Sequence, residues 1–377
     1  MGRRGRRHTD MDEPRPEGED WVEWGGQLMW AAGFTSGGAP FGMTVDEFRE
    51  DNARYHRKRG WVRAKEALRY AAADLLGPDA EFEVGWVKRI GQGLYRDVYA
   101  AEVEGLSAAG GIRRDLVALI PRADAPADLF ERTLREPLLL KTLCDLDLEL
   151  RVPQWSTVVL ESQRPVLVRE FVRGAPLDLR AGRQSRVRPW QVVGQTAAAV
   201  HAVDPRRVAG LVPAFETRRE HAIARVEEIE EIAGNPLADD VLAWIRGNLP
   251  RDEPASFLHG DLLGQNILID PVDPQRAVAV IDWEYSLVGD PAYDMAIVTR
   301  GVRRPFQMAD GLERVLAAYH EAGGAPLAKI DVHLHELCLL GGYLLDALRG
   351  DHPHPADQVL NHLRGALRRA EKDGNPG

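Results

Sequence analysis

The sequence predicts an α+β protein with two lobes, in which a β-rich lobe precedes a mainly α-helical lobe and a helical extension precedes both. Three observations lead to this fold class. At 377 residues the chain is longer than one compact core usually requires. Short apolar runs bounded by Gly, Pro and charged residues fill residues 80–173, as is typical of strands. Over residues 174–370 the apolar residues recur mostly at helical spacing.

The N-terminal segments differ from the lobes in composition. Residues 1–20 are rich in charged residues, Pro and Gly and carry almost no large apolar residue, so we expect a disordered tail. Residues 21–79 hold a tryptophan cluster followed by apolar residues at roughly helical spacing, and Thr44 with Glu47 looks like a capping box. We therefore expect an N-terminal helical appendage of two or three helices, whose simplest role is to cover exposed core surface.

Within the lobes the expected order of elements follows from the apolar pattern. Strand-like runs cover 82–90, 98–103 and 116–120, residues 129–146 read as a helix, and further strands follow over 152–171. The hinge to the helical lobe is expected near residues 170–174. That lobe is almost wholly helical, apart from short β segments near 257–285.

Composition excludes several classes of function. Lys and Arg total 48 against 58 for Asp and Glu, a net charge of −10, which disfavours nucleic acid and favours a cationic partner. Cys144 and Cys338 cannot form a disulfide framework, so both are expected to be free thiols. The apolar run over 337–348 is interrupted by Gly and Asp and is too short to span a bilayer. We expect a cytoplasmic protein without a membrane partner.

The most informative stretch is residues 257–284, where an apolar strand leads into a polar loop. Asp261 and Asn266 lie in this loop, an apolar strand follows, and the next strand ends on Asp282. Phosphoryl transfer needs one carboxylate to accept the proton of the attacking hydroxyl. It also needs an amide oxygen and a second carboxylate to hold Mg²⁺ against the nucleotide phosphates. A lone Asp is more often a turn former or a helix cap, but the joint spacing favours the catalytic interpretation.

These residues and the motifs around them resemble the aminoglycoside phosphotransferase family, whose members have the protein-kinase-like fold. The matching motifs are His259-Gly260-Asp261 with Asn266, Ile281-Asp282-Trp283-Glu284, and Gly289-Asp290-Pro291-Ala292-Tyr293-Asp294. The resemblance covers about residues 85–350 and implies a two-lobed protein-kinase-like fold. It implies that Asp261 is the catalytic base and that Asn266 and Asp282 are Mg²⁺ ligands. It further implies structural support of the catalytic loop by His259, Asp290 and Asp294.

The same resemblance implies that a nucleotide, ATP or alternatively GTP, binds between the lobes. Gly91 and Gly93 would let backbone N–H groups approach the phosphates, and Val98 would pack on the adenine. The other expected nucleotide contacts are Ala118 and the hinge residues Glu170, Phe171 and Val172.

One position departs from the family pattern. Kinases of this fold place a Lys or Arg on the strand at 116–120, where it binds the phosphates and pairs with a helix Glu, but the run here is apolar. The helix Glu is matched by Glu136. Strand alternation places Arg122 on the same face as Ala118 and Ile120. We hypothesise that Arg122 pairs with Glu136 and binds the phosphates. Arg96 stands where protein kinases have their third glycine, which predicts a stiffer loop.

The acceptor site is less defined by the sequence. Candidate acceptor-binding residues are Glu284, Glu336 and Asp346. Acidic residues at 227–231 and 239–240 could attract ammonium groups, although a solvated helix face is the simpler explanation.

The sequence thus predicts an ATP- and Mg²⁺-dependent O-phosphotransferase for a small molecule, with a cationic, aminoglycoside-like amino sugar as the leading acceptor. One alternative is a metabolic kinase for a sugar, a choline-like compound or an amino alcohol. Another is a non-catalytic nucleotide-binding module, which the missing lysine motivates. The oligomeric state stays open.

Overall fold

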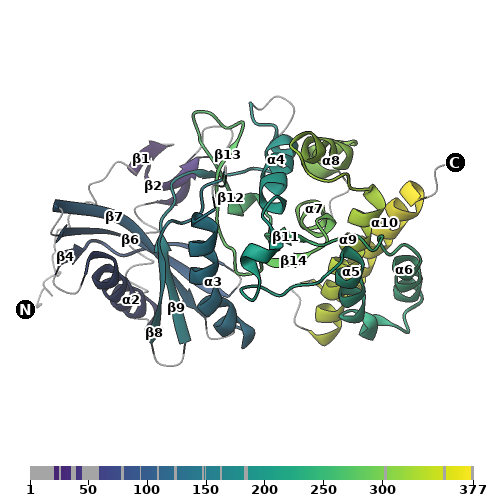
Figure 1. Cartoon of the computed structure of the whole chain (residues 1–377), viewed down its shortest axis with the longest axis horizontal. Coiled ribbons are helices and arrows are strands. Elements are labelled where there is room, and N and C mark those ends of the chain that lie inside the picture. The colour runs from purple at the N-terminus through teal and green to yellow at the C-terminus, as the bar shows by residue number, and fades with distance from the viewer. Residues whose placement is uncertain are drawn as a thin grey trace, which may run out of the picture.

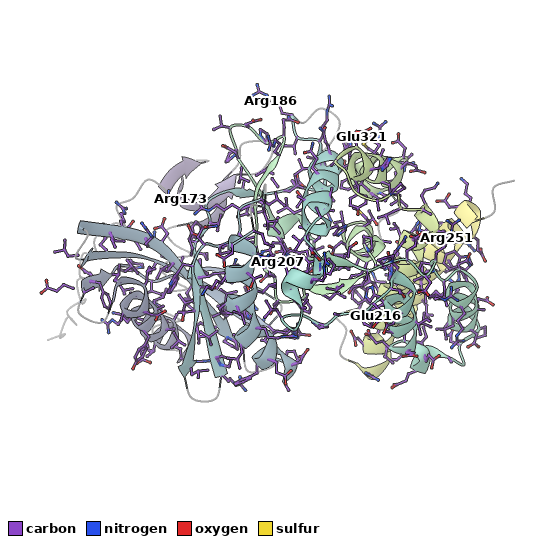
Figure 2. All side chains as sticks on the ribbon, in the orientation of Figure 1. Arg173, Arg186, Arg207, Glu216, Arg251 and Glu321 are labelled. Atoms are coloured by element: carbon purple, nitrogen blue, oxygen red, sulfur yellow. The ribbon has the colours of Figure 1, made fainter. Side chains whose placement is uncertain are left out.

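The strand-rich lobe lies at one end of the computed structural model and the helical lobe at the other (Figure 1). The structure describes residues 21–24, 27–34, 40–44, 59–77, 80–93, 95–107, 110–122, 125–146, 148, 150–161, 164–181, 186–300, 304–350 and 354–374. The chain passes between the lobes in residues 171–174, which connect β9 (Arg164–Glu170) to β10 (Ala175–Pro176). Arg173 in this segment donates two hydrogen bonds to Asp115 of the N-lobe, and Figure 2 shows it at the surface near the junction.

One antiparallel six-stranded sheet forms the frame of the N-lobe. Five of its strands follow the order β4-β6-β7-β9-β8, and the sixth strand, β5, also pairs with β6. Besides β9, its strands are β4 (Glu81–Val84), β5 (Lys88–Gln92), β6 (Arg96–Ser107), β7 (Gly110–Pro121) and β8 (Ser156–Glu161).

Strand alternation divides the side chains of this sheet between two faces. On one face, Ala118 packs in the same apolar cluster as α2 (Arg59–Leu76), whose Leu68 is fully buried there. On the opposite face, Val98 and Leu119 are directly paired in the β6–β7 register and share a second cluster. The expectation that Ala118 contacts the nucleotide is therefore corrected. Residues of β7 that share the face of Val98 have odd numbers, so Ala118 points toward α2.

The N-terminal extension is only partly helical. α2 is the described helix of the segment, and it covers the outer face of the N-lobe sheet as expected. The tryptophan-rich part instead forms the antiparallel strands β1 (Trp21–Trp24), β2 (Gln27–Phe34) and β3 (Pro40–Thr44). Aromatic residues favour strands, and the Gly-Gly dipeptide between β1 and β2 is typical of hairpins, which explains the difference. The expected capping box at Thr44 and Glu47 extends outside the described residues.

Helix α3 (Asp128–Cys144) connects the two lobes by packing. It lies against β8 and β9, and three leucines near its C-terminal end are buried in the main core of the helical lobe: Leu139, Leu140 and Leu143. This placement fixes the orientation of Glu136, which is 1% exposed on the same helix.

The C-lobe consists of helices around two small antiparallel sheets. One sheet has the order β10-β12-β13 and the other pairs β11 with β14. Its strands are β11 (Ser256–Leu258), β12 (Ile267–Ile269), β13 (Ala277–Val280) and β14 (Leu287–Gly289). Its α-helices are α4 (Pro189–His201), α5 (Arg218–Glu227), α6 (Pro236–Gly247), α7 (Ala292–Thr299), α8 (Gly311–Glu321), α9 (Lys329–Arg349) and α10 (Ala356–Gly374). None of the helices in the described part of the chain is long and apolar enough to cross a membrane.

Candidate active site

The loop between β11 and β12 brings Asp261 and Asn266 together. The amide nitrogen of Asn266 donates to the main-chain oxygen of Asp261 at 2.8 Å and to its carboxylate at 3.0 Å. A turn of 3₁₀ helix over Gly264–Asn266 folds the chain back and makes this contact. Burial raises the pKa of Asp261 and the neighbouring Asp282 carboxylate adds to this, while His259 opposes it. Asp261 and Asp282 are therefore close enough to interact.

A single buried carboxylate holds the first half of this loop. Asp294, at the start of α7, accepts hydrogen bonds from the backbone N–H groups of His259 and Gly260, both at 2.9 Å. It also lies 3.1 Å from Nε2 of His201. Burial disfavours ionisation of Asp294, but these donors outweigh it and lower its pKa. Asp294 thus keeps three donors satisfied and fixes the backbone before Asp261.

His259 has the contacts of a structural histidine. Its Nδ1 accepts a hydrogen bond from the backbone N–H of Asp261 at 3.2 Å, so Nε2 carries the proton and donates to the Ile281 carbonyl at 3.1 Å. The ring is fully buried and lies against Trp283, with ring centroids 4.7 Å apart. Because both nitrogens are engaged, His259 links the catalytic loop to the strand that ends at Asp282.

Asp282 follows β13 with a positive φ of 74°, which is rare outside glycine and is found preferentially at functional sites. Its carboxylate accepts no hydrogen bond from the described residues. The amide nitrogen of Asn266 is used by Asp261, which leaves its amide oxygen as a donor for a cation. In the described part of the chain, no three His, Cys, Asp or Glu side chains are arranged to hold a metal. The amide oxygen of Asn266 and the carboxylate of Asp282 are oxygen ligands of the kind that Mg²⁺ prefers, so these two residues would hold such an ion.

Asp290 has a different environment from Asp294. It accepts from Nε of Arg218 at 2.8 Å and from the backbone N–H of Ala292, and its other oxygen lies 3.0 Å from Nε2 of His335. Burial opposes its ionisation, but His335 and Arg218 outweigh this effect and lower its pKa to about 2. Asp290 precedes α7, accepts from the N–H of its first residue and contacts α5 and α9, so any support that it gives to the catalytic loop acts through α7.

The face of the N-lobe sheet opposite α2 is apolar, with Val98 and Leu119 in one cluster. Across the junction, Val172 packs with Leu268 and Ala279. Among the hinge residues, the backbone N–H of Glu170 donates to the Trp155 carbonyl and that of Phe171 to the Asp115 carbonyl. The N–H of Val172 has no backbone acceptor among the described residues. The Glu170 side chain is engaged by Arg151.

At the glycine-rich loop, Gly91 pairs with Val98, and the N–H of Gly93 donates to the Arg96 carbonyl at 2.7 Å. This bond closes the turn before β6.

The expected pair between Arg122 and Glu136 is corrected by the structure. Arg96 faces Glu136, with its Nη1 3.7 Å from the carboxylate, and the charge of Arg169 also acts on Glu136. Arg122 lies just beyond the end of β7, whereas Arg96 begins β6 on the same face as Val98. In the sequence, the spacing of two residues between Arg96 and Val98 indicates that their side chains share one face of a strand. The pairing of β6 with β7 is needed to show that this face is the inner one.

Arg96 also reaches the C-lobe, where its Nη2 lies 2.9 Å from the Glu284 carboxylate. Glu284 was expected to bind the acceptor, but the structure directs it toward Arg96. Burial raises the pKa of Glu284 to about 7, with the Asp282 and Glu136 carboxylates adding to the rise and Arg96 opposing it. Burial likewise raises the pKa of Glu136. Glu136 and Glu284 thus both face Arg96, and the charge of Asp282 acts on both of these carboxylates.

The other two candidate acceptor residues are not among these three carboxylates. Glu336 is 3% exposed, and its oxygens contact Arg369 at 2.7 Å and His333 at 3.3 Å within the C-lobe. Asp346 is exposed near the end of α9. In the acidic insertion, Glu228 pairs with Arg225, Glu230 with Arg246 and Glu231 with Arg349. These three carboxylates are thus in ion pairs with arginines of the C-lobe.

The two-lobed fold, with an Asp and an Asn in the loop after β11 and an Asp after β13, defines the class of kinase-like phosphotransferases. A family model described as the phosphotransferase enzyme family matches residues 86–331. Since this match covers more than half of the sequence, the chain belongs to that family. The protein is therefore an enzyme that phosphorylates a hydroxyl group.

Solved structures share the fold over most of the chain. The apoenzyme of the macrolide 2′-phosphotransferase MphH from Brachybacterium faecium is 22% identical, with a TM-score of 0.55 over 79% of this chain and 98% of that chain. The GDP complex of aminoglycoside 2′-phosphotransferase-IIIa is 16% identical, with a TM-score of 0.54 over 81% and 98%. A microcompartment-associated aminopropanol kinase is 20% identical, with a TM-score of 0.52 over 81% and 98%.

Among curated proteins, acyl-CoA dehydrogenase family member 11 of Gallus gallus is 30% identical over 111 residues. This alignment covers 28% of the chain and 14% of that relative, so the chain spans a small part of the relative's length.

Proposed function

We propose that this enzyme transfers the γ-phosphoryl group of ATP, or alternatively GTP, to a hydroxyl of a small cationic molecule in a Mg²⁺-dependent reaction. The observation that supports this most is the contact between Asn266 and the Asp261 carboxylate, with Asp282 close beside it. In this proposal Asp261 is the proton acceptor, and Asn266 and Asp282 are the two oxygen ligands for a cation. That arrangement is the one that in-line phosphoryl transfer requires.

In the proposed reaction Asp261 orients the acceptor hydroxyl and accepts its proton. A bond forms between the acceptor oxygen and the γ-phosphorus, and the bond from that phosphorus to the β–γ bridging oxygen breaks, which releases the nucleoside diphosphate. Asn266 and Asp282 would hold a Mg²⁺ ion, which would supply positive charge against the phosphates. Burial of Asp261 favours proton acceptance because it raises the basicity of the carboxylate.

For the nucleotide, we propose that the adenine lies between Val98 and Leu119 on the N-lobe side and Leu268 on the C-lobe side. The unused N–H of Val172 would donate to the base edge. GTP remains an alternative because a backbone donor serves either purine.

For the acceptor, we propose an amino sugar of the aminoglycoside type, on the basis of the net charge of −10. The structural likeness to an aminoglycoside phosphotransferase is in keeping with this choice. The likeness to an aminopropanol kinase favours a small amino alcohol as a second candidate. Both candidates present an ammonium group close to a hydroxyl.

The test is a nucleotide-consumption assay with a panel of acceptors: an aminoglycoside, a macrolide, 1-amino-2-propanol, choline and a hexose. We expect diphosphate release with an amine-bearing acceptor, together with a product that mass spectrometry shows to carry one added phosphoryl group. Turnover with the hexose alone would overturn the cationic-acceptor proposal. Nucleotide binding without turnover on any acceptor would favour the non-catalytic binding module.

A further inference from the structure

The inner face of the N-lobe sheet carries two buried arginines, Arg96 and Arg169, and Arg96 lies two residues before Val98 of the apolar inner cluster. The strand β7, where related kinases carry a basic residue, presents Val117 and Leu119 on this face. Arg96 begins β6 on the same face and is 4% exposed. A cation at this place is therefore supplied by β6 and not by β7.

Three contacts fix the guanidinium of Arg96. Its Nη2 donates to the Thr133 hydroxyl at 2.8 Å and lies 2.9 Å from Glu284, and its Nη1 lies 3.7 Å from Glu136. The backbone is fixed as well, because the Arg96 carbonyl accepts from Gly93. Arg96 thus has one position, set by the glycine-rich loop, by α3 and by the segment after Asp282.

These contacts leave part of the guanidinium unsatisfied. Nε and Nη1 of Arg96 are buried and have no hydrogen-bond partner in the described part of the chain. A buried donor without a partner costs free energy, and a planar guanidinium matches the oxygens of a phosphate. The guanidinium lies against Glu284, which follows Asp282 by two residues in the chain. A phosphate bound next to a cation at Asp282 would complete the site.

We propose that Arg96 binds the phosphates of the nucleotide in this enzyme, held in place by Glu136 and Glu284. This inference rests on the proposed nucleotide-dependent function. The cation reaches the phosphates from the strand that follows the glycine-rich loop, which compensates for the apolar residue on β7. Glu136 and Glu284 act as positioning residues, because they contact Arg96.

The experiment compares ADP with adenosine, since both contain adenine and ribose but only ADP has phosphates. Calorimetric titrations of the full chain with Mg²⁺ present would use wild type, Arg96→Met and Arg96→Lys. We expect Arg96→Met to weaken ADP binding by about 10- to 100-fold and to leave adenosine binding within about twofold. Arg96→Lys should recover part of the ADP affinity because it keeps the charge. Arg114→Met, at an exposed arginine of β7, is the matched control and should bind ADP like wild type.

The outcomes separate this inference from the proposed function. A wild-type chain that binds neither ADP nor ATP would overturn both. Normal ADP affinity in Arg96→Met would overturn the role of Arg96 but not the proposed function. Equal losses of affinity for ADP and adenosine would do the same, because they indicate a structural role. Loss of ADP binding in Arg122→Met, with Arg96→Met unaffected, would assign the phosphates to Arg122. If Arg96→Met does not fold, the affinities of Arg96→Lys for ADP and adenosine are compared instead. Equal changes in the two affinities would again contradict the proposal.

Discussion

The Asp294 carboxylate accepts hydrogen bonds from the backbone N–H groups of His259 and Gly260 at 2.9 Å each. One fully buried side chain of α7 therefore sets the backbone that leads into Asp261. This relationship couples the stability of the C-lobe to the geometry of the catalytic loop, because the same carboxylate also binds His201.

Asp294→Asn should destabilise the protein, because an amide can accept at one atom only and its NH₂ group would face the existing donors. We expect the free energy of unfolding to fall by about 2–4 kcal/mol, measured by urea denaturation. Asp240→Asn, at an exposed residue of α6, is the control and should change it by less than about 0.5 kcal/mol. Equal effects of the two substitutions would contradict the assigned role of Asp294.

Asp290 predicts a dependence of stability on pH. Its folded-state pKa of about 2 lies below the ordinary value of 3.8, so ionised Asp290 stabilises the fold above about pH 4. That contribution, about 2 kcal/mol, is lost as the pH falls from about 4 to about 2. The difference in unfolding free energy between wild type and Asp290→Asn should therefore shrink over this range. A difference that stays constant would show that Asp290 is not held ionised.

Gly260 and Gly342 should respond to alanine in opposite directions. Gly260 has φ of +79°, and a Cβ there would collide with the Tyr285 carbonyl, so Gly260→Ala should cost at least about 2 kcal/mol and distort the loop before Asp261. Gly342 lies inside α9, where a Cβ meets nothing within 4 Å, so Gly342→Ala should stabilise by up to about 1 kcal/mol. Thermal unfolding measures both. Destabilisation by Gly342→Ala of the same size as that by Gly260→Ala would contradict this reading.

The helix α2 should contribute to the N-lobe core although it precedes the region that matches the family model. Leu68 is fully buried against the sheet, so Leu68→Ala should lower the free energy of unfolding by about 2–5 kcal/mol. Val62 on the same helix is 44% exposed, and Val62→Ala should have a small effect. Chemical denaturation followed by tryptophan fluorescence would measure the two. A small effect of Leu68→Ala would mean that α2 is not part of the folded core.

The sequence was sufficient to predict the order of the lobes and the association of Asp261 with Asn266. These features depend on local spacing, because a short loop between two strands brings residues five positions apart into contact. Likewise, the carboxylates of Asp290 and Asp294 at the start of α7 could be recognised from their motif alone.

Features set by the pairing of distant strands could not be predicted. The inward placement of Arg96 and the outward placement of Ala118 follow from the β6–β7 register, which pairs Val98 with Leu119. A shift by one residue would exchange the two faces, and the apolar run in β7 is consistent with either choice. The strands of residues 21–44 were interpreted as helical because a tryptophan cluster carries no clear period.

The kinetics of Asp261→Asn test the central claim most directly. With the acceptor identified by the panel, we predict that kcat falls by about 100- to 10,000-fold while the affinity for ATP stays within about threefold of wild type. The amide keeps an oxygen that can accept from Asn266, so the loop should retain its geometry. A kcat within tenfold of wild type would contradict the assignment of Asp261 as the base that enables phosphoryl transfer.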